Sequence, residues 1–301
     1  MRGQLGPTPY EEVVIRNPQG EPLSTIHSLY ASDGHLYIGT TKGLYRCFQT
    51  PSGNWTQDPL FRAFPGSSIA HIHAVYDHLI LSDHDGLWYW PLGNTDPSLN
   101  YRLSLPESVS SDRVYKYVST QVGDFITTRT GVYPVANRQL GEPLPGTNGW
   151  LTYDVLYSQS SESLWVGARE GVARYVHERE QWAFDTLFSP QNGGTTNNMA
   201  LYETQRGLWS TSMASGLFYF DYETQEPSVW PIANSDEDQL AICMIIDVQD
   251  RLWVTSTSGV SVVRGLLDSI TVLPAVGLPE SDYWQNEASK LPNGNLVLHL
   301  N

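Results

Sequence analysis

Positive charge is scarce in this sequence. Its 301 residues contain 17 Lys and Arg against 32 Asp and Glu, which gives a formal net charge of −15 at pH 7. A surface of this charge repels phosphate backbones and anionic lipid headgroups, and no cluster of basic residues offsets it. The composition therefore argues against nucleic acid and against a membrane surface as partners.

Cysteine is also rare, and long apolar stretches are missing. The two cysteines, Cys47 and Cys243, fall in different copies of the repeat described below, so we expect two buried thiols and no disulfide. No apolar run approaches the roughly 18 residues that a membrane-spanning helix needs. The first residues, Met1 to Gln4, lack the apolar segment of a secretory signal. If the protein is exported, we expect this chain to be an excerpt from which the signal is missing.

Glycine, proline and aromatic residues are plentiful instead. The sequence has 25 Gly, 19 Pro, 10 Trp and 17 Tyr, hydrophobic residues make up 40% of it, and only 16% is charged. That apolar fraction is enough to bury a core. Many aromatic residues together with frequent turn formers are typical of short strands joined by turns, rather than of helices. The composition therefore favours an all-β fold.

A repeat runs through the chain with a period of 40 to 45 residues. Each copy has a short apolar strand, a polar turn, a glycine followed by an apolar residue, and a second strand. The glycines that mark the copies are Gly43, Gly86, Gly131, Gly171, Gly216 and Gly259. This period suits one four-stranded blade of a β-propeller. We name the strands of a blade A to D from the axis outward, so that the glycine lies in the B–C turn.

A seventh copy begins at Asn293-Gly294 and lacks the later glycine of the other copies. We therefore predict an all-β fold, a seven-bladed β-propeller of four-stranded antiparallel blades whose last blade is incomplete. Residues 1–301 form this single domain, which we expect to be an excerpt of a longer protein. The predicted blades are centred on residues 24–60, 69–103, 113–140, 152–187, 198–232, 240–274 and 285–301.

Two further expectations concern ring closure and packing. The segment 11–15 (Glu-Glu-Val-Val-Ile) is expected to add the outer strand of the last blade, because closure removes exposed strand edges. The aromatic residue at the second position of strand B is expected to fill the space between blades rather than to bind sugar. These aromatic residues are Tyr37, Phe125, Trp165, Trp209 and Trp253.

The motif at 164–175, Leu-Trp-Val-Gly-x-x-x-Gly-Val-x-x-Tyr, resembles the repeat of the two-component-regulator propeller family. The resemblance runs from about residue 20 to the end, although Ile80 and Phe125 replace the Trp in the second and third copies. In that family such propellers are periplasmic sensor regions of membrane-anchored regulators, including hybrid histidine kinases. The resemblance implies a periplasmic location, a small-molecule or oligosaccharide ligand, and downstream signalling domains of the same protein as partners.

Polar and aromatic residues are expected to gather at the axis on one face of the ring. In a propeller the D–A loops and the B–C turns share a face, which commonly binds ligands near the axis. Trp beside Asn, Arg and His suits a sugar, which offers an apolar ring face and hydroxyl groups. For each residue, a solvated position without a ligand is the competing interpretation. The candidate ligand-binding residues are His71, Arg113, Arg129, Trp150, Arg169, Asn198, Trp284 and Asn286.

Motifs for catalysis and metal binding are weak or missing. His71 and His73 lie two apart on a predicted strand, a spacing that can bind a metal, but no third ligand is evident. Asp83-His84-Asp85-Gly86 resembles a fragment of a calcium loop, and a glycine-containing turn explains it. Serine-nucleophile, P-loop and zinc-protease signatures are absent from the sequence. We therefore predict no catalytic residue, no metal site and no cofactor.

Three functional hypotheses follow. The favoured one is a ligand-sensing propeller of a two-component-type signalling protein, with its ligand on the axial face. The second is an enzyme on the same scaffold, such as a polysaccharide or small-molecule lyase, because propellers host both classes. A pair of carboxylates across the opening would favour this enzyme. The third is a protein-interaction platform without a small ligand.

Overall fold

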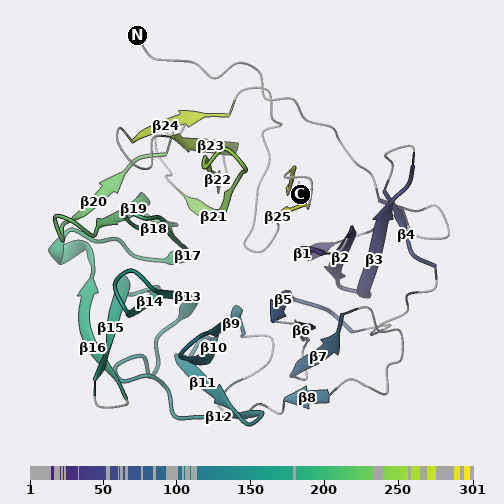
Figure 1. Ribbon diagram of the computed structural model, residues 1–301, viewed down its shortest axis with the longest axis horizontal. Helices are drawn as coiled ribbons and strands as arrows, with labels where there is room; N and C mark the ends of the chain where they lie inside the picture. The colour runs from purple at the N-terminus through teal and green to yellow at the C-terminus, as the bar shows by residue number, and fades with distance from the viewer. Residues whose placement is uncertain are drawn as a thin grey trace.

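A computed structural model of the chain shows antiparallel sheets arranged as blades around a central axis (Figure 1). The structure describes residues 15–16, 21, 23, 25–32, 34–51, 55–59, 61, 64, 67–75, 77–83, 86–92, 101–103, 105, 109, 114–178, 181–232, 240–256, 259–264, 270–275, 288–291 and 295–298. Within these residues the sheets contain six four-stranded blades and a two-stranded sheet. The predicted β-propeller of four-stranded antiparallel blades is confirmed.

The first three blades follow one another along the chain. The first contains β1 (Ile26–Ser32), β2 (His35–Thr40), β3 (Gly43–Gln49) and β4 (Trp55–Gln57). The second contains β5 (His71–Val75), β6 (His78–Ser82), β7 (Leu87–Pro91) and β8 (Tyr101–Leu103). The third contains β9 (Lys116–Thr120), β10 (Gly123–Thr127), β11 (Val132–Ala136) and β12 (Gln139–Leu140).

The next three blades repeat this order. The fourth contains β13 (Thr152–Ser158), β14 (Ser163–Ala168), β15 (Val172–Glu178) and β16 (Gln181–Phe188), and a 3-10 helix (Pro190–Asn192) follows it. The fifth contains β17 (Asn198–Glu203), β18 (Gly207–Ser212), β19 (Gly216–Asp221) and β20 (Pro227–Trp230). The sixth contains β21 (Ala241–Ile246), β22 (Leu252–Ser256), β23 (Gly259–Arg264) and β24 (Thr271–Pro274).

The two-stranded sheet closes the ring between the sixth and the first blade. It consists of β25 (Ala288–Lys290) and β26 (Leu296–Leu298), and β25 contacts both β1 and β21. The Ala31 N–H donates a hydrogen bond to Ser289 Oγ at 2.9 Å, and Val297 packs against the core of the first blade. The four-stranded blades therefore number six rather than seven, because the described residues beyond β24 form only these two strands.

The closing strand expected at residues 11–15 falls mostly outside the described residues. Residues 11–14 are among those not described. Ile15 packs on the core of the first blade, and its carbonyl oxygen accepts a hydrogen bond from the Leu23 N–H at 3.0 Å. The outer strand of the last blade therefore stays a prediction.

Strand B lies inside each complete blade, and its second or third residue packs between blades. All residues of β14 and of β18 are buried. The predicted packing role of the aromatic residues at this position is confirmed, because each of them is at most 7% exposed: Tyr37, Phe125, Trp165, Trp209 and Trp253. Burial of aromatic rings at one repeated position holds neighbouring blade faces together.

Side-chain hydrogen bonds join consecutive blades close to the axis. Thr127, the last residue of β10, donates from Oγ1 to the Tyr153 carbonyl in β13 at 3.1 Å. Thr211 of β18 does the same toward the Ile242 carbonyl in β21 at 3.0 Å. Both acceptors are the second residue of the next inner strand. Strand B of one blade is thus bonded to strand A of the following blade.

Alanine at Gly171 is expected to destabilise the fold more than alanine at Gly123. Gly171 has φ +153°, and an added Cβ would lie 2.3 Å from the Phe188 carbonyl oxygen. Gly123 has φ +132°, and nothing lies within 4 Å of its Cβ position. Backbone strain alone is expected to cost Gly123→Ala about 1–2 kcal/mol. Gly171→Ala adds a collision with backbone, so about 3 kcal/mol or more is expected from urea denaturation. Equal losses would contradict this account of the repeat.

The two cysteines lie in different blades: Cys47 is buried in β3 and Cys243 is partly buried in β21. Burial, and then the charge of Asp58, raises the pKa of the Cys47 thiol to about 12. Cys47 is therefore protonated and unreactive in the folded protein. No helix among the described residues is long and apolar enough to cross a membrane.

Candidate functional site

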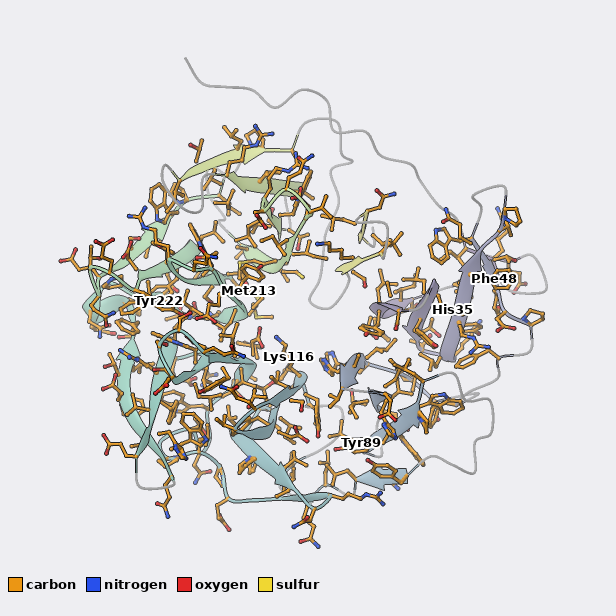
Figure 2. The ribbon with its side chains drawn as sticks, in the orientation of Figure 1. His35, Phe48, Tyr89, Lys116, Met213 and Tyr222 are labelled. Carbon is orange, nitrogen blue, oxygen red and sulfur yellow. The ribbon has the colours of Figure 1, made fainter. Side chains whose placement is uncertain are left out.

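Polar side chains from three neighbouring blades meet at the axis. They come from the start of β5, β9 and β13 and from the B–C turns beside them. Figure 2 shows Lys116, the first residue of β9, at the inner side of its blade and toward the middle of the ring. The axial group, as we name it, consists of His71, His73, Tyr115, Lys116, Tyr153 and Asp154, with Arg129 and Arg169 at its rim.

Two stacked histidines form the second-blade side of the axial group. The rings of His71 and His73 are inclined by 24° with centroids 6.2 Å apart. Burial, and then the nearby His27, lowers the pKa of His71 from 6.5 to about 4. Burial, followed by the charges of His71 and Lys116, holds the pKa of His73 well below its usual range. Both imidazoles are therefore neutral at pH 7, and Nε2 of His73 is buried without a hydrogen-bond partner among the described residues.

Two tyrosines connect the histidines to the arginines of the rim. The Tyr115 ring lies 6.0 Å from that of His71 and packs edge-on against Tyr153 at 5.3 Å. Arg129 Nε donates to the Tyr115 hydroxyl at 3.2 Å. Burial raises the pKa of Tyr153, with a further rise from Tyr115, while the charges of Arg169 and Arg129 oppose it. The Tyr153 hydroxyl therefore keeps its proton at pH 7.

An ion pair crosses from the third blade to the fourth. Nζ of Lys116 pairs with Oδ1 of Asp154, whose side chain is 4% exposed, whereas the lysine side chain is 32% exposed. The carboxylate also accepts the backbone N–H groups of Val155 at 2.7 Å and of Leu201 at 2.8 Å. Burial raises the pKa of Asp154, and Lys116 opposes this rise. Asp154 thereby anchors the ammonium while part of the lysine stays open to solvent.

The axial group supplies several kinds of polar contact within one small region. Neutral imidazoles offer one donor and one acceptor each, and tyrosine hydroxyls offer both. The guanidinium and ammonium groups of Arg129, Arg169 and Lys116 donate only, and they bind oxyanions through charge-assisted hydrogen bonds. This combination suits a small molecule that carries hydroxyl groups, negative charge, or both.

The predicted ligand-binding residues do not all belong to the axial group. The structure brings His71, Arg129 and Arg169 together around the two tyrosines. Three other candidates lie outside the described residues, so nothing is said of their placement: Arg113, Trp284 and Asn286.

Asn198 has a structural position inside the fold. Its side chain is fully buried at the start of β17. Its Oδ1 accepts hydrogen bonds from Thr195 Oγ1 at 2.7 Å and Ser210 Oγ at 3.2 Å, and its Nδ2 donates to the Thr195 carbonyl at 3.2 Å. With these partners the amide secures the connection into β17 instead of facing the opening.

Trp150 lies over the interface between the third and the fourth blade. Its partly buried ring packs against a cluster that contains Phe125 and Tyr175. It also meets the ring of Phe184 edge-on at 6.5 Å. Phe184 belongs to the outer strand β16, at the periphery of the ring (Figure 1). The structure therefore separates Trp150 from the axial group.

Five members of the axial group are not among the ligand-binding candidates predicted from the sequence: His73, Tyr115, Lys116, Tyr153 and Asp154. A signal for them exists in the repeat, because Lys116 and Asp154 lie within the first three residues of β9 and β13. These are the same inner positions that pointed to His71. The repeat does not predict that Lys116 and Asp154 form an ion pair, because the two residues belong to different blades.

The two weak metal motifs do not form a metal site among the described residues. Asp83 accepts hydrogen bonds from the Gly86 N–H at 3.0 Å and from Trp88 Nε1 at 2.8 Å. This carboxylate therefore shapes the B–C turn, while residues 84 and 85 of the motif are not described. No group of three or more His, Cys, Asp or Glu side chains that could hold a metal ion occurs in the described part of the chain.

Comparison with known proteins identifies the fold but no family. No protein-family model and no curated protein matches the chain. Streptogramin B lyase is 12% identical over 92% of this chain and 91% of its own, with a TM-score of 0.67. The WD40 β-propeller domain of Doa1 is 12% identical over 92% and 89%, also at 0.67. A chain of the Mitotic Checkpoint Complex is 11% identical over 100% and 96%, at 0.68.

One further likeness concerns a signalling protein. The extracellular domain of a putative hybrid two component system from B. thetaiotaomicron is 14% identical over 95% of this chain and 49% of its own, with a TM-score of 0.46. A TM-score this low carries no argument about family. The chain is therefore a β-propeller of a kind that serves unrelated functions, and its function has to be argued from the axial group.

Proposed function

We propose that this chain is a ligand-sensing propeller that binds a small polyhydroxyl or anionic molecule, such as an oligosaccharide, at the axial group. The observation that carries the proposal is the gathering of Lys116, Arg129 and Arg169 around two tyrosines and two neutral histidines. The chain as a whole has a net charge of −15. Three cationic side chains in one region therefore differ in sign from the average charge of its surface. Aromatic and charge-bearing groups at a propeller axis suit a small ligand.

The signalling context of this proposal comes from the repeat. The motif at 164–175 resembles that of the two-component-regulator propellers, and on this ground we propose a sensor region located in the periplasm. Its other partners would then be downstream signalling domains of the same protein. A binding event at the axis would be passed on by those domains rather than by chemistry within the propeller.

A lyase activity is the second candidate, and the neutral histidines favour it. The His71 and His73 rings stack 6.2 Å apart at the axis, and a neutral imidazole can act as a general base. Streptogramin B lyase shares the fold. Mass spectrometry of any bound ligand after incubation with the protein separates the two candidates, because a lyase returns an unsaturated product and a sensor returns the ligand intact.

Calorimetric titration with a panel of neutral and acidic oligosaccharides tests the binding proposal. The double variant Arg129→Ala, Arg169→Ala is expected to bind at least about tenfold more weakly than the unaltered protein, because charge-assisted hydrogen bonds are lost at the rim. Arg102→Ala is the matched control, since Arg102 is exposed on the outer strand β8 over the Trp88 ring. Its affinity is expected to stay within about twofold.

Two results would count against an axial binding site. One is a double variant that binds as tightly as the unaltered protein. The other is an equal loss in Arg102→Ala, which would mean that binding depends on overall charge rather than on the rim. The thermal unfolding of each variant is measured alongside, so that misfolding is not mistaken for a lost contact.

A further inference from the structure

The charges within the axial group have the opposite sign to the chain as a whole. Lys116, Arg129 and Arg169 contribute three positive charges, against the two carboxylates of Asp154 and Glu170. Glu170 pairs with Arg169 at 3.4 Å, and Asp154 pairs with Lys116. The neutral histidines add nothing at pH 7. Over these five described residues the sum is a single net positive charge, in a protein that carries −15 overall.

Lys116 keeps unused donor capacity where it faces the axis. An ammonium has three N–H donors, and the pairing with Asp154 is the contact that anchors it. The Lys116 side chain as a whole is 32% exposed and lies toward the middle of the ring (Figure 2). Its charge is felt at His73, whose pKa it lowers. The ammonium is thus held still by a buried partner and is open on its axial side.

Asp154 supports this arrangement without competing for the open side. Its two oxygens accept the N–H groups of Val155 and Leu201 from within the fold. These bonds fix the carboxylate behind Lys116, so the lysine loses little further freedom when a ligand binds. A preorganised ammonium binds an oxyanion more tightly than a mobile one, because less ordering is required on binding.

A neutral ligand is expected to bind the axial group more weakly than an anionic one. A hydroxyl can accept from the ammonium, but it leaves the net positive charge of the axial group partly desolvated and uncompensated. An oxyanion compensates the charge and accepts the stronger, charge-assisted hydrogen bonds. A polyanion, in contrast, is repelled by the acidic remainder of the surface. The chemistry therefore matches a small acidic ligand rather than a long polyanion.

We propose that the ligand of the axial group carries an oxyanion, either a carboxylate or a phosphate, and that Lys116 binds it with Arg129 and Arg169 at the rim. This inference rests on the proposed axial binding function and specifies its ligand class. Lys116 acts as a specificity-determining residue, because it distinguishes an acidic molecule from its neutral counterpart of the same shape.

The test compares an acidic and a neutral trimer of the same linkage, with a sugar phosphate as a third probe. Calorimetric titration uses a galacturonate trimer, a galactose trimer of the same linkage and glucose 6-phosphate, at about 20 mM and about 500 mM salt. The galacturonate trimer or glucose 6-phosphate is expected to bind at least about tenfold more tightly than the galactose trimer at low salt. The difference is expected to shrink at high salt, because screening weakens the ion contact. Which acidic probe binds distinguishes the carboxylate from the phosphate.

Substitutions at Lys116 then assign the preference to one residue. Lys116→Met is expected to abolish the preference for the acidic ligand, because the acidic ligand loses more affinity than the neutral trimer does, whereas Lys116→Arg is expected to keep the preference. Because Lys116→Met leaves Asp154 without its cation, the double variant Lys116→Met, Asp154→Asn is measured as well. The single amide oxygen of asparagine can accept only one of the two backbone N–H groups, from Val155 or from Leu201, that the carboxylate oxygens of Asp154 accept. Thermal unfolding of this double variant is therefore measured alongside its binding.

The possible failures are distinguishable. Two results would contradict the proposal that Lys116 binds an oxyanion. In one, the neutral trimer binds as tightly as the acidic ligands; in the other, both variants that carry Lys116→Met keep the preference. Neither result would contradict binding at the axial group itself. If no probe binds to the unaltered protein, the oxyanion proposal fails together with the proposed function.

Discussion

Replacing Trp165 by alanine is expected to lower the free energy of unfolding by about 3–5 kcal/mol. The side chain is fully buried, and its ring lies 6.1 Å from that of Phe188 and 5.3 Å from that of Phe220. Phe220 belongs to the fifth blade and Trp165 to the fourth, so the substitution opens a cavity between two blades that cannot easily close. Urea denaturation followed by circular dichroism measures the loss.

Three further variants separate the effect of the cavity from other effects. Phe184→Ala removes an aromatic ring that is 43% exposed, and it is expected to cost less than about 1.5 kcal/mol. Trp165→Phe is expected to cost less than Trp253→Phe. The reason is that Trp253 Nε1 donates to Asp247 Oδ2 at 2.8 Å, while Trp165 Nε1 has no hydrogen-bond partner among the described residues. The reverse order would mean that the indole nitrogen of Trp165 has a role the packing does not explain.

Acidification from pH 6.5 to about 4 is expected to destabilise the protein through the axial histidines. The folded state holds the pKa of His71 at about 4, first by burial and then through His27, whereas the unfolded chain takes up the proton near pH 6.5. The unfolded state therefore binds more protons throughout this window, and stability falls as the pH falls. His71 alone accounts for a loss of up to about 3 kcal/mol.

The variant His71→Gln, His73→Gln isolates this contribution. Its stability is expected to change less between pH 6.5 and 4 than that of the unaltered protein, as measured by urea denaturation at each pH. His177→Gln is the control, because His177 is exposed on β15 and packs on the Trp182 ring at 5.0 Å. Asp154 acts in the opposite direction, since burial raises its pKa in the folded state. An identical pH profile for the double variant and the unaltered protein would show that the histidines are solvated.

Much of the fold could be predicted because the repeat specifies it locally. The glycine of each copy marks the B–C turn, and an aromatic residue two positions into strand B marks the space between blades. The predicted fourth blade, 152–187, matches β13 to β16, which run from Thr152 to Phe188. The number of complete blades was harder to predict. The partial copy of the repeat at 293–300 does not indicate how many strands its blade contains.

The candidate site was less predictable because burial and pairing depend on neighbouring blades. His71 and Asn198 both begin an inner strand, so the sequence gives no reason to predict different roles for them. In the structure the Asn198 side chain forms hydrogen bonds with Thr195 and Ser210, whereas the His71 ring lies next to the Tyr115 ring. The pair of Lys116 and Asp154 joins residues 38 positions apart in two different repeats, and no local pattern indicates such a contact.

The hydrogen bonds from Thr127 to Tyr153 and from Thr211 to Ile242 have a consequence for cooperativity. Repeat arrays whose units touch only through side-chain packing can fray one unit at a time. Here strand B of one blade is bonded to the backbone of the next, and the Leu201 N–H is bonded to Asp154 across a third boundary. We therefore expect blades three to six to unfold together, as one cooperative unit. Their inner amide protons should exchange with solvent at a common, slow rate set by the opening of the whole unit.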